Sequence, residues 1–202
     1  MLAFIVACDR RDPALGLFVD TMAESGSRPS QIARLLVGDL VADPLKPRLL
    51  MPRSAKGGGK NRAERKTQRV PVPITSRLAQ RLAAAARGRV PGAPLLLQSD
   101  GISWGKEPSQ SYRADVREIV AGLGWDADVV TLYSLRHSSI VRQLLANVPV
   151  RVVASTHDTS VAMIEKHYSR FIADHSDEHT RRALLKPAAP PPVADNIVAL
   201  GR

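Results

Sequence analysis

The sequence predicts a mainly helical α+β domain with one small antiparallel sheet. Apolar residues recur at helical spacing over most of the chain, two short β-prone runs flank a glycine-rich segment, and no internal repeat is present. The 202 residues are 44% hydrophobic and 24% charged, which is typical of a folded chain rather than a disordered one. This length is sufficient for one domain with its own core.

The N-terminal region is expected to be helical. Residues 1–20 are apolar and lack the basic leader and cleavage site of a signal peptide, so we interpret them as a buried helix. A second helix is expected within 21–40, with Ser25 or Ser27 as its cap. Its apolar stripe is Ile32, Leu35, Leu36 and Leu40.

The predicted sheet is a β-hairpin. Its strands are "PRLLMP" and "QRVPVPI", and the segment that joins them is glycine-rich and basic. Because proline has no backbone N–H to donate, Pro71 and Pro73 restrict the second strand to an edge of the sheet.

Helices dominate the second half of the chain. Gly88 is expected to end the first of them, and Pro149 to begin a short one. Residues 187–202 are proline-rich with a short apolar end, which predicts a linker and a tail. The longer predicted helices cover residues 76–88, 111–124, 138–149 and 161–175.

The charge of the chain indicates its partner. Lysine and arginine number 29 against 19 acidic residues, giving a net charge of +10 and an isoelectric point near 10.5. Residues 52–69 carry seven basic residues against Glu64 alone, so more than half of the net charge is concentrated there. Nucleic acid is the commonest polyanionic partner of such a segment.

The sequence gives no support for a membrane protein or for a disulfide-stabilised secreted protein. No apolar run is long enough to span a bilayer, so no membrane partner is expected. Cys8 is the single cysteine and cannot form an internal disulfide, which leaves a cytoplasmic location as the default expectation.

Three residues draw attention when they are taken together. Tyr168 lies on the apolar face of the last predicted helix, where packing alone would account for it. Arg136 precedes a histidine in "TLYSLRHSS" and forms a compact donor group with it. Arg28 stands at a helix start after a Gly-Ser turn. Each residue by itself has an ordinary explanation as a core or solvated side chain.

In this order the segments resemble a known family. "SGSRPSQIARLLVGDL", a basic hairpin ending "RVPVPI", "LYSLRHS" and "IEKHYSRF" are similar to the catalytic domain of tyrosine recombinases, the phage-integrase family. The resemblance runs from about residue 12 to about residue 175. It implies the tyrosine recombinase catalytic-domain fold and site-specific DNA recombination or integration on double-stranded DNA.

The resemblance implies a role for individual residues. Arg28 and Arg136 match the two catalytic arginines, and Tyr168 matches the nucleophile. Lys56 is the best match to the hairpin lysine that serves the family as general acid, with Lys60 and Lys66 as further candidates.

The implied reaction explains these residue types. Two arginines can clamp the non-bridging oxygens of a phosphodiester as charge develops on them. A phenol near neutral pH needs positive neighbours and a base to become a nucleophile. The product is a covalent 3′-phosphotyrosine and a free 5′-hydroxyl, so rejoining needs neither ATP nor a metal, and no cofactor is expected.

The chain departs from the family pattern at three positions. Tyr133 replaces the first residue of the usual His-x-x-Arg box, and Gln31 replaces an acid three residues after the first arginine. The third motif places His or Trp nine residues before the nucleophile, where this chain has Thr159. His157 lies two residues earlier and is our first candidate for that role, with His167 as the alternative.

The resemblance also predicts domain organisation and assembly. Residues 1–186 are expected to form the catalytic domain, without the N-terminal core-binding domain of the family. Self-association on DNA is expected, with the tail at 187–202 as the segment passed to a neighbouring protomer. The alternative hypothesis is a catalytically impaired DNA-binding remnant or accessory protein of the same fold. A third, a relaxing topoisomerase-like enzyme, would relax supercoils without strand exchange.

Overall fold

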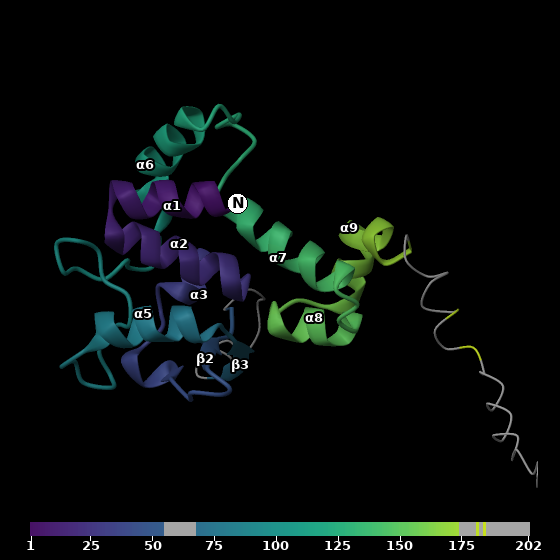
Figure 1. The fold of residues 1–202 in the computed structure, drawn as a ribbon, viewed down its shortest axis with the longest axis horizontal. Helices are drawn as coiled ribbons and strands as arrows, with labels where there is room; N and C mark the ends of the chain where they lie inside the picture. The colour runs from purple at the N-terminus through teal and green to yellow at the C-terminus, as the bar shows by residue number, and fades with distance from the viewer. Residues whose placement is uncertain (55–67, 174–180, 182–183, 185–202) are drawn as a thin grey trace, which may run out of the picture.

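The computed structural model describes residues 1–54, 68–173, 181 and 184, and it consists mainly of helices with one small sheet (Figure 1). The predicted fold class is confirmed. The helices are α1 (Leu2–Arg11), α2 (Pro13–Ser25), α3 (Pro29–Ile32), α5 (Ser76–Ala86), α6 (Ser109–Gly122), α7 (Tyr133–Leu145), α8 (Val150–Thr156) and α9 (Val161–Ala173), with a short 3-10 helix, η1 (Val37–Asp39). The strands are β1 (Leu40–Val41), β2 (Arg48–Pro52) and β3 (Arg69–Pro73).

The N-terminal helical region is divided in two. Pro13 occupies the first position of α2, and the Asp12 carboxylate accepts a hydrogen bond of 2.8 Å from the backbone N–H of Ala14. This combination of a capping aspartate and a first-turn proline starts a new helix where the sequence suggested a continuous one. The result is a pair of packed helices, α1 and α2, of which α2 is almost entirely buried.

The predicted helix within residues 21–40 is wrong in extent. Residues 21–25 are the end of α2, and after them only α3 is an α-helix in this range. The backbone that follows α3 finds partners elsewhere: the N–H groups of Val37 and Gly38 donate to the carbonyls of Ala93 and Pro91, each at 2.9 Å. The chain then enters η1 and β1.

The cap of α3 also differs from the prediction. Its N-cap is Arg28, whose backbone N–H donates to the Gln31 side-chain oxygen at 3.1 Å. The Ser25 hydroxyl donates instead to the carbonyl of Thr21 at 2.7 Å, within α2. The side chain of Gln31 thus accepts from the backbone at the start of the helix, where we predicted a serine cap.

The hairpin prediction is confirmed, with one strand added. The sheet has the order β1-β2-β3, and both pairings are antiparallel. Leu49 pairs with Val72, and both side chains are buried. Pro71 and Pro73 lie on β3, which is an edge strand as their missing N–H groups require.

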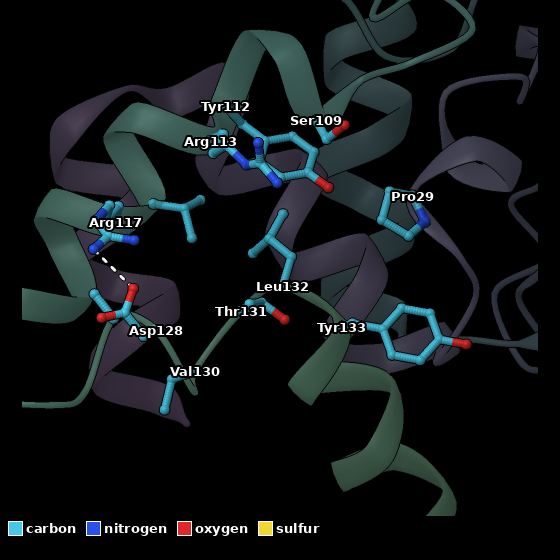
Figure 2. Close-up of a pocket in the computed structure, with 12 residues that line it drawn as sticks. Pro29, Ser109, Tyr112, Arg113, Arg117, Asp128, Val130, Thr131, Leu132 and Tyr133 are labelled. Atoms are coloured by element: carbon cyan, nitrogen blue, oxygen red, sulfur yellow. Dashed lines mark ion pairs between the residues drawn. The ribbon is translucent and has the colours of Figure 1, made fainter.

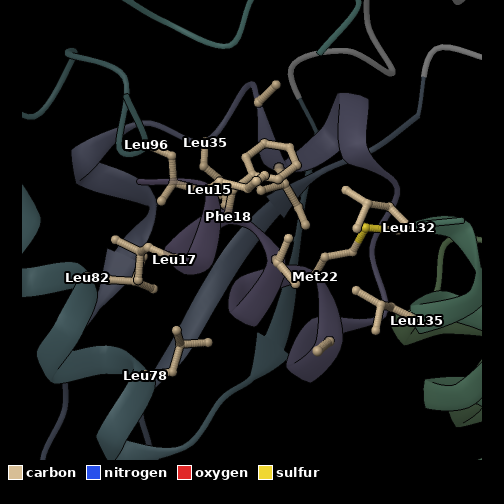
Figure 3. Packing of buried hydrophobic residues seen from close by; sticks show 14 of the residues in the cluster. Leu15, Leu17, Phe18, Met22, Leu35, Leu78, Leu82, Leu96, Leu132 and Leu135 are labelled. Carbon is tan, nitrogen blue, oxygen red and sulfur yellow. The ribbon is translucent and has the colours of Figure 1, made fainter. Parts of the chain in front are cut away.

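The described residues form two apolar clusters that share one helix. The larger surrounds α2, and Figure 3 shows Leu132 and Leu135, at the start of α7, beside Met22 of that helix. The smaller one lies between α7, α8 and α9, which gather at one end of the molecule (Figure 1). Because α7 belongs to both clusters, the residues near its middle stand at their junction. The smaller cluster contains Ile140, Leu144, Val153, Ala154, Ile164 and Tyr168.

The helices predicted after the hairpin are all present, with shifted ends. Helix α7 begins at Tyr133, five residues before the predicted start, so the "LYSLRHS" segment is largely helical. Pro149 is the N-cap of α8, as expected. Within the described part of the chain, no helix combines the length and apolarity needed to cross a membrane.

Candidate active site

Arg136 is a buried cation held by backbone carbonyls. It lies in the first turns of α7, where Leu132 and Leu135 anchor the helix in the larger cluster. Its two terminal nitrogens donate to the carbonyl of Gly26 at 2.9 Å and to that of His157 at 2.5 Å, and the residue is 3% exposed. Burial, followed by the charge of Arg28, lowers the arginine pKa to about 10, so the group stays charged near neutral pH.

Neutral partners leave that charge uncompensated. Among the ion pairs between described residues, none involves Arg136, whose two direct acceptors are both carbonyls. A buried cation without a carboxylate partner is a favourable place for an incoming anion.

Arg28 approaches the same region from the start of α3. Its terminal nitrogens donate to the Asp158 carbonyl at 3.2 Å, and one of them also reaches the Asp158 carboxylate at 3.4 Å. The buried Nε atom has no hydrogen-bond partner in the structure. Distances at the long end of the hydrogen-bond range indicate a loosely held guanidinium that retains capacity for another acceptor.

The turn after α2 brings these groups together. Gly26 has a φ of +63°, and a Cβ atom there would lie 2.4 Å from the His157 Nε2 and 2.6 Å from the Ser139 hydroxyl. Glycine is therefore needed at this position for both its backbone conformation and its lack of a side chain. Its carbonyl is then free to accept from Arg136.

Asp158 links three elements of the site. One carboxylate oxygen accepts from the backbone N–H of Ser54 at 2.6 Å, from the Gln31 amide at 3.2 Å and from Arg28 at 3.4 Å. Gln31 stands where the family pattern has an acid, and its amide also donates to the carbonyl of Pro52 at 2.8 Å. A carboxylate from the turn before α9 thus contacts the residue that replaces the expected acid.

His157 is buried and already fully engaged. Its Nδ1 lies 2.9 Å from the Val153 carbonyl and its Nε2 lies 3.1 Å from the Ser139 hydroxyl. Because a carbonyl can only accept, Nδ1 carries the proton and Nε2 accepts from the serine. Burial lowers the imidazole pKa to about 4, so the ring is neutral near pH 7. In this arrangement it supports the turn that binds both arginines.

Thr159 and His167 contribute less to the arrangement. Thr159 donates its backbone N–H to the Ala154 carbonyl at 2.9 Å, and His167 is exposed on α9. At the start of α9, the Ser160 hydroxyl accepts from the N–H of Met163 at 3.2 Å.

Tyr168 combines a buried ring with a polar contact. Its ring belongs to the smaller cluster, while its hydroxyl lies 2.5 Å from the Nδ1 of His137 on α7. Burial raises the tyrosine pKa, the Arg136 charge opposes this shift, and Tyr133 adds to it. The phenol is therefore protonated near neutral pH in the free protein, rather than a preformed phenolate.

Tyr133 lies at the border of a neighbouring cavity. Its side chain is 41% exposed, and its ring meets that of His137 edge-on with 5.2 Å between centroids. The cavity has a volume of about 480 Å³ between α6 and the start of α7 (Figure 2). Pro29 and Tyr133 line it, whereas Arg136 and Tyr168 do not. The cluster of arginines and tyrosine therefore lies beside this cavity rather than inside it.

The base of the hairpin carries further arginines. The backbone N–H of Arg53 donates to the Gln68 carbonyl at 3.1 Å, and Arg34 donates to the Arg53 carbonyl at 2.6 Å. Lys56, the predicted general acid, lies outside the described residues, as do Lys60 and Lys66. No group of three or more metal-ligating side chains occurs within the described ranges.

Solved structures with the same architecture provide a comparison. The catalytic domain of bacteriophage HP1 integrase matches with a TM-score of 0.59 and 17% identity, over 94% of each chain. XerA recombinase matches with a TM-score of 0.61 and 13% identity, over 91% of this chain and 62% of its own. The Tn1549 transposon integrase, solved in complex with transposon right end DNA, gives a TM-score of 0.63 and 15% identity over 89% and 62%.

The chain has the fold of a tyrosine recombinase catalytic domain. It spans nearly all of the HP1 catalytic domain and about 62% of the XerA and Tn1549 chains. No protein-family model matches the sequence, and no curated protein matches it.

Within this recombinase fold, three residues outside the predicted set take part in the site. Gly26, His137 and Asp158 contact the predicted residues directly. The sequence could have indicated His137, because this residue directly follows Arg136 and forms a compact donor group with it. No signal in the sequence indicates that the Asp158 carboxylate reaches Gln31.

Proposed function

We propose that this chain is the catalytic domain of a site-specific DNA recombinase or integrase that cuts and rejoins double-stranded DNA through a 3′-phosphotyrosine intermediate. The observation that carries the proposal is the convergence of Arg28, Arg136 and Tyr168 from α3, α7 and α9. Arg136 lies within electrostatic range of the other two, because the charge of Arg28 lowers its pKa and the ionised form of Tyr168 raises it.

The two arginines are proposed to bind the scissile phosphate. A phosphodiester gains charge on its non-bridging oxygens as it is attacked, and guanidinium groups stabilise that charge with directed donors. Arg136 supplies a buried positive charge. Arg28 supplies N–H donors whose present hydrogen bonds, to Asp158, are long.

Tyr168 is proposed as the nucleophile. Its ring is fixed in the smaller apolar cluster, which limits the positions that its hydroxyl can adopt. Attack on phosphorus forms a tyrosine–phosphate ester and releases the 5′-oxygen, which takes a proton from a lysine of the hairpin. Lys56 is our assignment for that lysine, and no cofactor or metal enters the reaction.

Double-stranded DNA is the proposed substrate. The net charge of +10 and the basic residues between 52 and 69 favour a polyanion, and XerH recombinase and Tn1549 integrase were solved with DNA. Self-association on DNA, with the tail at 187–202 as the exchanged segment, belongs to the same proposal.

A nicked suicide DNA substrate tests this function. We expect a covalent protein–DNA adduct that survives denaturing detergent, because the nick lets the 5′ fragment diffuse away and prevents religation. Tyr168→Phe removes the hydroxyl and is expected to abolish the adduct. Equal adduct formation by Tyr168→Phe would show that another residue is the nucleophile.

A DNA-binding remnant without activity is the second candidate function. Two observations favour it: the Asp158 carboxylate already contacts Arg28, and Gln31 and Tyr133 depart from the family pattern. This candidate predicts salt-dependent DNA binding with no adduct at any pH or salt concentration. Binding by gel shift together with the suicide substrate separates the two functions.

A further inference from the structure

We propose that His137 is the general base that accepts the proton of Tyr168 when the tyrosine attacks the phosphodiester. This inference rests on the proposed function and names the base that the tyrosine nucleophile needs. The carrying observation is the distance of 2.5 Å between the His137 Nδ1 and the Tyr168 hydroxyl oxygen. A general base must lie within hydrogen-bond reach of the proton that it accepts, and this contact meets that condition directly.

The geometry defines which groups exchange the proton. A neutral imidazole with its proton on Nε2 presents Nδ1 as an acceptor, and the phenol donates to it. The ring centroids of His137 and Tyr168 are 5.8 Å apart, so the contact joins the two rings at their polar edges. His137 as a whole is exposed to solvent.

Burial keeps the base neutral and the phenol protonated. Burial, then Arg136 on the same helix and His167 on α9, lower the pKa of His137 below its ordinary value. The pKa of Tyr168 is raised above its ordinary value, chiefly by burial. The proton therefore resides on the phenol before the reaction, and a neutral acceptor stands beside it.

The step balances without a further reactant. The Tyr168 oxygen forms a bond to phosphorus while its proton moves to the His137 Nδ1, giving an imidazolium. The bond between phosphorus and the 5′-oxygen breaks, and that oxygen takes a proton from the hairpin lysine. In the religation step the imidazolium returns its proton to the departing tyrosine.

The other candidates for the base are less well placed. Tyr133 occupies the position where the family has a histidine, but its own hydroxyl is a phenol and its ring meets His137 edge-on. His157 uses Nδ1 on the Val153 carbonyl and Nε2 on the Ser139 hydroxyl. His137 lies one helical turn after Tyr133 on α7, so this chain still presents a histidine close to the place where the family pattern has one.

Single-turnover adduct formation on the nicked substrate tests the role. We expect His137→Gln to slow the step by roughly 100-fold or more, the usual contribution of a general base. The wild-type rate should fall as the pH drops through the lowered pKa of His137, because protonation removes the acceptor. This acidic limb should be absent in His137→Gln, and added imidazole should partly restore His137→Ala.

A matched control and a spectroscopic measurement complete the test. Ser138→Ala, at the neighbouring position on α7, should keep both rate and acidic limb, and thermal unfolding confirms that each variant folds. By NMR titration, Tyr168→Phe should raise the His137 pKa, because the neutral ring loses a donated hydrogen bond. An unchanged His137 pKa would contradict the contact itself.

The outcomes separate this inference from the function on which it rests. An adduct from the wild type, with an equal rate and an intact acidic limb in His137→Gln, overturns the role of His137 alone. A wild type that binds DNA and forms no adduct overturns the proposed function, and the base role with it.

Discussion

Arg28 and Arg136 donate hydrogen bonds to the carbonyl oxygens of consecutive residues, Asp158 and His157, at 3.2 Å and 2.5 Å. One turn therefore positions both guanidinium groups. The same turn leads into α9, which carries Tyr168. The arrangement couples the proposed phosphate clamp to the proposed nucleophile through a few residues of backbone.

Arg136→Lys should slow adduct formation by roughly 100-fold, since a lysine keeps the charge but cannot donate to two carbonyls in the fixed geometry of a guanidinium. The single-turnover rate on the nicked substrate measures this effect. Arg142→Lys is the matched control, because Arg142 lies on the same helix and also donates to a backbone carbonyl, that of Ala23 at 2.7 Å, which is not one of the carbonyls that bind Arg28 or Arg136. Equal losses in the two variants would mean that Arg136 acts through stability alone.

Gly26→Ala should destabilise the domain by about 1–3 kcal/mol through its left-handed backbone, and further through the contact of a methyl group with His157. Chemical denaturation measures the change. Gly92→Ala serves as the control, since Gly92 has no positive φ and a Cβ added there would meet no atom within 4 Å. A Gly26→Ala variant as stable as Gly92→Ala would contradict the close approach of the two turns.

Asp158→Asn should lower the free energy of unfolding by about 1–2 kcal/mol, because hydrogen bonds to a charged group are stronger than those to an amide. Asparagine tolerates the φ of +48° at this position, so the substitution tests the charge. Asp128→Asn is the control, as its ion pair with Arg117 is largely exposed and should contribute little. Indistinguishable unfolding curves would show that the Asp158 carboxylate does not stabilise the site.

His157 should make the domain less stable at acidic pH. Its folded pKa of about 4 lies below the ordinary value of 6.5, so the unfolded chain binds more protons between these values. Stability is then fully retained above pH 6.5 and falls as the pH drops toward 4, by up to about 3 kcal/mol. The difference between wild type and His157→Gln in denaturation at several pH values isolates this contribution. Parallel pH profiles would contradict a buried neutral imidazole.

Much of the fold follows from local sequence patterns. The hairpin could be predicted because β-prone runs flank a glycine-rich segment, and its edge strand because Pro71 and Pro73 lack N–H donors. The extent of the helix after Arg28 could not be predicted, since Val37 and Gly38 leave helical geometry to reach carbonyls more than fifty residues away. Helical spacing of leucines carries no information about such partners.

The sequence alone determined which residues can carry the chemistry: two arginines and a tyrosine in a recognisable order, together with a strongly basic segment. Tertiary structure decided what those residues contact. Arg28 meets Asp158 across 130 positions, and the Tyr168 hydroxyl meets His137 across 31. Such contacts arise from the packing of helices and from the close approach of His157 to Gly26. The local periodicity of apolar residues does not encode either of these features. The order of residues indicates the proposed reaction, and the packing of α7 against α9 places the His137 Nδ1 beside the Tyr168 hydroxyl.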